Sequence, residues 1–139
     1  MRNLSEIVSR KRPLTLPASA SVREACCEMR DRRIGAVLVT NRTGRLLGIF
    51  TGRDAVGRVV AAGKSAAKTK LSTVMTADPV TMTSDMTAID ALRLMWDGGF
   101  RHIPVVEDDQ IVGIVSRGDF QSEERGRLEE ERNLWENIR

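Results

Sequence analysis

The chain has 139 residues, of which 41% are apolar, a size and composition that suit one compact domain or two small units sharing a core. Its 22 basic and 19 acidic side chains leave a net charge of +3, too small and too dispersed to indicate a nucleic-acid binder. No apolar run approaches the roughly 18 residues of a membrane span, and the N-terminus lacks the apolar core of a secretory signal. We therefore expect a cytoplasmic protein.

The first half begins with a short extended segment followed by a helix. Residues 14–16 follow a proline and predict a short strand. Ser21 and Glu24 have the spacing of a helix capping box, in which a hydroxyl and a carboxylate satisfy the first free amides. The apolar residues that follow recur with the helical period: Val22, Ala25, Cys26 and Met29.

Two strands and a second helix complete the first half. Residues 36–40 and 46–50 are short apolar runs without room for a helix, and the turn-forming sequence NRTG separates them. A further helix is predicted to start near Asp54. The order of elements is therefore strand, helix, strand, strand, helix.

The second half repeats this order. The elements predicted there are a strand at 80–82, a helix capped by Thr87 and Asp90, strands at 103–107 and 111–115, and a helix starting near Asp119. In the alignment of the halves, Pro13 matches Pro79 and Asp54 matches Asp119. Because each half alone would bury too little apolar surface, we expect the copies to pack on each other and on a second chain, forming a homodimer.

The last segment, residues 123–139, is predicted to be a charged helix. Leu128, Trp135 and Ile138 fall close to one stripe along it. This stripe could pack on its own unit or contact a second chain or another partner, and the sequence leaves both alternatives open.

Two closing sequences carry a family resemblance. GIFTGRDAV at 48–56 and GIVSRGDF at 113–120 share a glycine, two apolar residues, a hydroxyl residue, two variable residues and an aspartate. They resemble the closing motif of the CBS domain, and KLSTVMTADPVTM at 70–82 is similar to the opening segment of that family. The resemblance extends from Leu4 to about Phe120 in two copies.

The resemblance implies a mixed α+β fold of two tandem CBS units. Each unit would have the order β-α-β-β-α, and a pseudo-twofold axis would relate the two units as in a Bateman module. The corresponding division of the chain is 1–66 for the first CBS unit, 67–122 for the second and 123–139 for the C-terminal helix. The resemblance also implies an adenosyl ligand in the cleft between units. AMP, ADP or ATP is the expected ligand, S-adenosylmethionine and NAD are further candidates, and no cofactor is required.

The chemistry of the closing motif fits a nucleoside. An aspartate three residues after a hydroxyl places an acceptor and a donor on one rim. Asp54 or Asp119 could accept both hydrogens of a ribose diol, while Thr51 or Ser116, beside the positive end of a helix, could meet a phosphate. Two flanking arginines could add positive charge: Arg53 and Arg117. The alternative is that both aspartates only cap their helices.

The resemblance implies further contacts near the cleft. Arg101 and His102 would approach ligand phosphates, although His102 could instead pack or face solvent. The implied contacts on the base side are Thr15, Thr81, Ile103 and Pro104. The first copy has Gly35 and Ala36 where the second has Arg101 and His102, so phosphate binding at the Asp54 motif has less support.

No catalytic or metal-binding motif stands out, because the chain has no Cys/His ligand cluster, no phosphate-cradling glycine loop with a lysine, and no nucleophile paired with its single histidine. We predict a regulatory module, not an enzyme, that senses an adenosyl ligand and signals to a protein partner by conformational change. The main alternative is a dimerising scaffold that binds no ligand. A weaker alternative is an RNA or DNA binder with strongly salt-dependent affinity.

Overall fold

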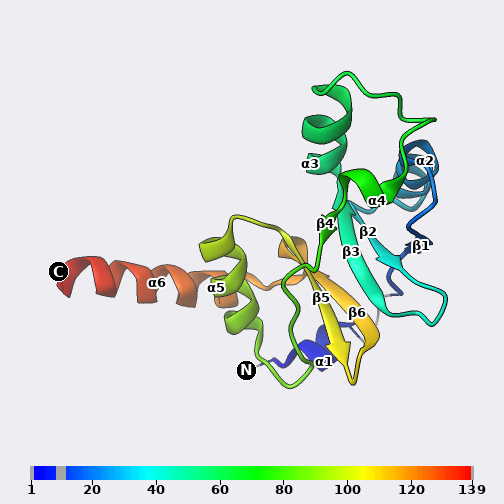
Figure 1. Ribbon diagram of the computed structural model, residues 1–139. Coiled ribbons are helices and arrows are strands. Elements are labelled where there is room, and N and C mark those ends of the chain that lie inside the picture. Colours follow the sequence, from blue (N-terminus) through cyan, green and yellow to red (C-terminus); the bar gives the residue numbers. More distant parts are fainter. Residues whose placement is uncertain (1, 9–11, 139) are drawn as a thin grey trace. The chain divides into compact units, whose positions relative to one another are not determined.

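The computed structural model describes residues 2–8 and 12–138, with side chains through residue 134, and divides the chain into two compact units (Figure 1). The first unit comprises Pro13–Val80 and Asp108–Ile111. The second comprises Met1–Arg12, Thr81–Glu107 and Val112–Arg139. Each unit is a mixed α+β structure with its own apolar core.

The first unit contains a four-stranded sheet in the order β1-β2-β3-β4. Its strands are β1 (Thr15–Pro17), β2 (Ala36–Thr40), β3 (Leu46–Thr51) and β4 (Thr76–Ala77). β1 runs parallel to β2, whereas the β2/β3 and β3/β4 pairs are antiparallel. The central strand β2 is buried over four of its five residues, which explains why its sequence is continuously apolar.

Four helical segments complete the first unit. They are α2 (Val22–Arg32), α3 (Gly52–Asp54), its π-helical continuation η1 (Ala55–Val60) and α4 (Leu71–Val74). The Ser21 half of the capping box predicted for α2 is confirmed, since the Ser21 hydroxyl accepts a hydrogen bond from the Glu24 amide at 3.0 Å. α2 packs an apolar face on the sheet through buried Val22, Ala25 and Met29.

The second unit is built around a helix and a hairpin. Its elements are α1 (Leu4–Val8), α5 (Ala88–Gly98), β5 (His102–Glu107), β6 (Gln110–Ser116), the short turn η2 (Arg117–Asp119) and α6 (Ser122–Ile138). Thr87 and Asp90 form the predicted capping box at the start of α5. The strand predicted at 80–82 is reduced to a single parallel bridge between Met82 and Val105.

The second closing motif departs from the prediction that a long helix starts at Asp119. η2 is one 3₁₀ turn, and Phe120 after it returns to an extended backbone. Phe120 is buried in the core of its unit, so the chain turns inward there before α6 begins at Ser122. Leu128 on α6 is buried in the same core, whereas the side chains of Trp135 and Ile138 lie outside the described residues.

The two units exchange their opening helices. α1 from the start of the chain joins the second unit, where the Leu4 amide donates to the Met86 carbonyl at 2.9 Å. α4 from the middle of the chain joins the first unit, where the Leu71 amide donates to the Ala20 carbonyl at the same distance. The compact units therefore exchange segments across residue 66, the boundary expected from the sequence. The reason is that the opening helix of each half is hydrogen-bonded to the other half, at the loop that precedes α5 or α2.

Candidate functional site

The first closing motif is a tight turn at the end of β3. Asp54 Oδ2 accepts hydrogen bonds from the Thr51 amide at 2.9 Å and from the Thr51 hydroxyl at 3.2 Å. The Gly52 amide donates to the Gly35 carbonyl at 3.2 Å, which ties the turn to the start of β2. The motif therefore holds its hydroxyl and its carboxylate together at one edge of the sheet.

The second closing motif repeats this geometry at the end of β6. Asp119 Oδ2 accepts from the Ser116 amide at 2.7 Å and from the Ser116 hydroxyl at 3.2 Å. The Arg117 amide donates to the Arg101 carbonyl at 3.0 Å, just before β5. Both aspartates thus perform the capping role, and in each motif this role uses one of the two carboxylate oxygens.

The predicted residues of the first unit gather at one edge of the sheet. Thr15 starts β1, and its register partner is Leu38, the middle residue of β2. Thr51 at the end of β3 pairs with Ala36, the first residue of β2. Because β1 and β2 are parallel and β3 is antiparallel to them, Thr15 lies at the same edge as the closing motif.

The predicted residues of the second unit meet at the corresponding end of the β5/β6 hairpin. Arg101 and His102 precede and start β5, next to the end of β6. The Met82 amide donates to the Pro104 carbonyl at 3.1 Å, which places Thr81 beside this strand. Ile103 is fully buried in the core, and Thr81 and Arg101 are exposed.

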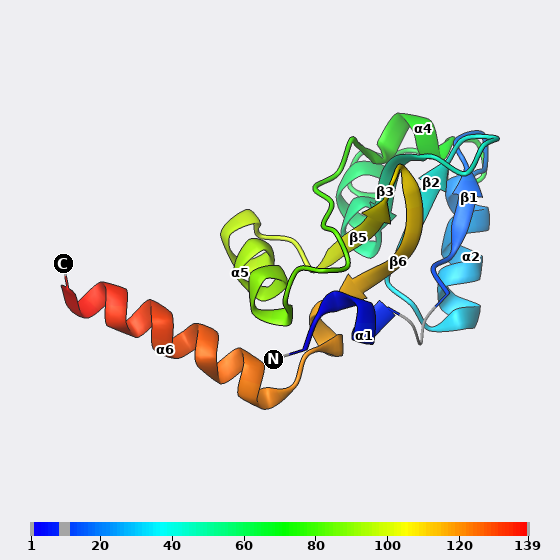
Figure 2. The ribbon, with the colours of Figure 1, turned by 90° about the horizontal axis from the view of Figure 1, so that it is seen from below.

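The glycine of each closing motif allows another segment of its unit to approach closely. A Cβ on Gly48 would lie 2.5 Å from the Met75 sulfur and 2.8 Å from the Thr76 carbonyl oxygen. A Cβ on Gly113 would lie 2.6 Å from the Val8 Cβ. Figure 2 shows α1 beside β6, in agreement with the second of these contacts. The motif glycines are therefore required for packing within each unit.

Arg58 is a residue of the first motif that the sequence analysis missed. Its Nε lies 3.6 Å from Asp54 Oδ1, and its Nη1 donates to the carbonyls of Val74 at 3.3 Å and Met75 at 3.0 Å. The second carboxylate oxygen of Asp54 therefore faces a guanidinium that is anchored on the end of α4. The spacing of four residues between Asp54 and Arg58 is typical of a helical ion pair and was the available signal.

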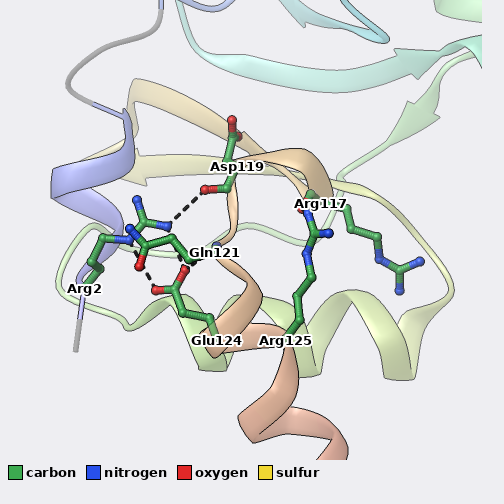
Figure 3. Close-up of polar contacts among 6 residues, drawn as sticks. All are labelled: Arg2, Arg117, Asp119, Gln121, Glu124 and Arg125. Atoms are coloured by element: carbon green, nitrogen blue, oxygen red, sulfur yellow. Dashed lines mark hydrogen bonds and ion pairs between the residues drawn. The ribbon is translucent and has the colours of Figure 1, made fainter.

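The partly buried ion pair of Arg2 and Glu124 supports the backbone of the second closing motif. Arg2 Nη2 donates to Glu124 Oε1 at 2.7 Å and to the Asp119 carbonyl at 3.0 Å, and Glu124 Oε1 also accepts from the Gln121 amide at 2.8 Å (Figure 3). The Asp119 carboxylate points away from this pair. Burial opposes ionisation of Glu124, but the hydrogen bonds from Arg2 and Gln121 outweigh it, so the pKa of Glu124 lies below its ordinary value.

The arginines of the second motif differ in their surroundings. The Arg117 guanidinium lies 5.7 Å from the centre of the Trp96 ring and forms no hydrogen bond or ion pair with the described residues. The exposed Arg101 side chain likewise has no such partner among them. The hydrogen bond from the Arg117 amide to the Arg101 carbonyl therefore joins two segments whose arginine guanidinium groups still have N–H donors available.

The duplicated motif agrees with a known family. The CBS domain model matches residues 4–61 and again residues 71–125, which covers both copies. The chain belongs to the CBS domain family. The membership confirms the mixed α+β fold of two tandem CBS units, and it agrees with the expectation of a binding module rather than an enzyme.

Several CBS proteins resemble this chain closely. A CBS domain-containing protein of Arabidopsis thaliana is 41% identical over 102 residues, which are 73% of this chain but only 18% of that protein. The crystal structure of a CBS-domain containing protein from Agrobacterium tumefaciens is 34% identical, with a TM-score of 0.78 over 84% of this chain and 94% of that one. A CBS domain protein from Pyrobaculum aerophilum, solved as a complex with AMP, is 26% identical, with a TM-score of 0.80 over 91% and 97% of the two chains. This CBS chain thus spans less than a fifth of the Arabidopsis relative.

Two further properties bear on the kind of site. No described helix is both long and apolar enough to cross a membrane. Within residues 2–8 and 12–138, no group of three or more His, Cys, Asp or Glu side chains could hold a metal ion. The CBS motifs in this part of the chain present hydroxyls, carboxylates, arginines and backbone amides.

Proposed function

We propose that the chain is a regulatory module that binds an adenosyl ligand at its CBS closing motifs and signals to a protein partner. The observation that carries this proposal is the duplicated motif, in which a Ser or Thr hydroxyl and an Asp carboxylate share one sheet edge in each unit. The AMP complex of the Pyrobaculum relative supports the choice of ligand class. AMP, ADP or ATP is the first choice, and S-adenosylmethionine and NAD share the same adenosine.

In this proposal the aspartate and the hydroxyl residue of each closing motif have different roles. Asp54 and Asp119 accept from ribose hydroxyls, and the hydroxyls of Thr51 and Ser116 turn from these carboxylates to donate toward a phosphate. The other proposed contacts are Thr15, Arg53, Thr81, Arg101, His102, Ile103, Pro104 and Arg117. Arg58 faces the second oxygen of Asp54, so a diol at the first motif has to displace it.

The experiment that tests the proposal is a calorimetric titration with the five adenosyl ligands. Asp119→Ala should abolish binding at the second motif while the protein stays folded. Asp90→Ala is the matched control, because Asp90 Oδ2 makes the same capping bond to the Thr87 amide, at 3.1 Å, outside the motif. Each substitution should cost about 1 kcal/mol of stability as a lost cap. Binding that survives in the double variant Asp54→Ala/Asp119→Ala would contradict the proposal.

The alternative function is a dimerising scaffold that binds no ligand. It is favoured by the capping bonds, since Asp54 and Asp119 each have a structural role without a ligand. The scaffold predicts no heat with any adenosyl ligand and a dimeric mass by light scattering. The sensor proposal also includes a homodimer, so the titration and not the mass distinguishes the two. We place either function in the cytoplasm, where the free adjacent thiols of Cys26 and Cys27 suit a reducing environment.

A further inference from the structure

The exposed ring of Trp96 on α5 is shared by two arginines. Trp96 is 48% exposed although its helix packs in the core of the second unit. The Arg117 guanidinium lies 5.7 Å from the ring centre and the Arg132 guanidinium lies 4.2 Å from it. Both distances fall within the range of a cation–π interaction.

The two arginines come from parts of the second unit with different roles. Arg117 belongs to the closing motif, between Ser116 and Asp119, and its guanidinium has no hydrogen-bond acceptor among the described residues. Arg132 lies on α6, where it also faces Asp97 of α5 at 3.7 Å. Trp96 therefore stands between the candidate ligand site and the C-terminal helix.

The Trp96 ring orients Arg117 without using its donors. A guanidinium has five N–H donors, and a cation–π contact leaves them available to an anion. A carboxylate partner would instead have neutralised Arg117 and competed with a ligand. An aromatic partner is thus the kind of contact that keeps an arginine charged, oriented and ready for a phosphate.

The shared ring also connects Arg117 to α6. Two guanidinium groups on one ring repel each other, so a phosphate that neutralises Arg117 lessens this repulsion and strengthens the contact of the ring with Arg132. α6 is further bound to α5 by the ion pair of Arg93 with Glu131 at 2.7 Å and to the motif by Arg125, which donates to the Arg117 carbonyl at 2.9 Å. A change of charge at Arg117 therefore acts on a helix that already contacts the Arg117 backbone.

We propose that Trp96 is a positioning residue for the second closing motif, which holds Arg117 over its ring ready for a ligand phosphate and, when that phosphate neutralises Arg117, holds α6 more firmly through Arg132. This inference rests on the proposed function and deepens it, because it assigns a phosphorylated ligand to the motif and an output helix to the module. It predicts that AMP and ATP act on α6 and that adenosine, which has no phosphate, does not.

The first part of the test is affinity. Calorimetry should show AMP binding to Trp96→Leu about two- to fivefold more weakly than to the unsubstituted chain, the range expected for loss of one exposed cation–π contact. Trp96→Phe keeps an aromatic face and should recover part of that loss. Adenosine should bind Trp96→Leu and the unsubstituted chain equally, because it offers Arg117 no phosphate.

The second part is the response of Trp96 and α6. In a Trp135→Phe background Trp96 is the remaining tryptophan, and AMP should change its emission while adenosine should not. Hydrogen exchange of the amides of residues 122–134 should slow with AMP, and Arg132→Ala should abolish this change. Arg127→Ala is the matched control, since Arg127 is an exposed arginine of α6 without a partner among the described residues, and it should preserve the response.

The outcomes separate this inference from the function on which it rests. AMP and ATP could bind Trp96→Leu with the same affinity as the unsubstituted chain, or AMP could leave the hydrogen-exchange rate of α6 unchanged. In either case the inference is wrong and the proposed function stands. If neither nucleotide binds the unsubstituted chain, the inference is wrong together with a nucleotide-sensing function.

Discussion

Arg2 and Glu124 form an ion pair at 2.7 Å between the N-terminal segment and the first turn of α6. Glu124 is the buried charged side chain of the second unit, and the same Arg2 guanidinium also binds the Asp119 carbonyl. The pair joins two segments 122 positions apart and supports the closing motif through its backbone.

Removing Arg2 should destabilise the protein. Arg2→Ala removes the guanidinium that pairs with a buried carboxylate and donates to a motif carbonyl, which should cost roughly 1–3 kcal/mol of unfolding free energy. Urea unfolding followed by circular dichroism measures this loss. Arg12→Ala removes an exposed arginine of similar charge and should change stability by less than about 0.5 kcal/mol. Equal effects of the two substitutions would show that the pair does not stabilise the fold.

The pair also predicts a specific acid sensitivity. The pKa of Glu124 is lowered from its ordinary value of 4.5, so its ionised form is favoured by folding. The resulting stabilisation is fully present above about pH 4.5 and is lost as the pH falls through the lower pKa of the folded state. The stability difference between the unsubstituted chain and Glu124→Gln should therefore shrink below pH 4.5. Glu123→Gln, at an exposed neighbour, should show no such convergence.

A side chain at Gly113 should loosen the second unit. In Gly113→Ala the new Cβ would meet the Val8 Cβ at 2.6 Å, so α1 or β6 must move, at a cost of about 1–3 kcal/mol. Gly126→Ala is the control, because nothing lies within 4 Å of its Cβ position in α6 and alanine favours a helix. Thermal unfolding should show a lower Tm for Gly113→Ala and an equal or higher Tm for Gly126→Ala. Partial rescue by Val8→Ala would identify the clash as the cause.

Arg58 should stabilise the first unit mainly through its backbone contacts. Its ion pair with Asp54 is half exposed and long, at 3.6 Å, whereas it donates two hydrogen bonds to the end of α4. Arg58→Ala should cost about 1 kcal/mol, and a double-mutant cycle with Asp54→Ala should give a coupling energy below about 1 kcal/mol. Arg42→Ala, at an exposed arginine without a partner among the described residues, is the control. A coupling energy well above that limit would mean that the ion pair dominates.

Much of the local structure followed from the sequence. The Ser21 and Thr87 caps, the strands after α2 and α5, and the repeated order of elements are set by residues within a few positions of one another. Local patterns predict such features because capping bonds and the strand period of two act over short distances. The closing motifs were located for the same reason, since hydroxyl and aspartate are three residues apart in each.

The remainder depended on contacts between distant segments. The sequence did not predict that α1 and α4 exchange units, that Phe120 interrupts the helix expected at Asp119, or that Arg2 pairs with Glu124. The motif glycines could be identified in the sequence, but their role in packing became evident only from the positions of Val8 and Met75 in the structure. Which segments bury each other's apolar surface is decided by the packing of the whole unit, and neither local spacing nor composition contains that information.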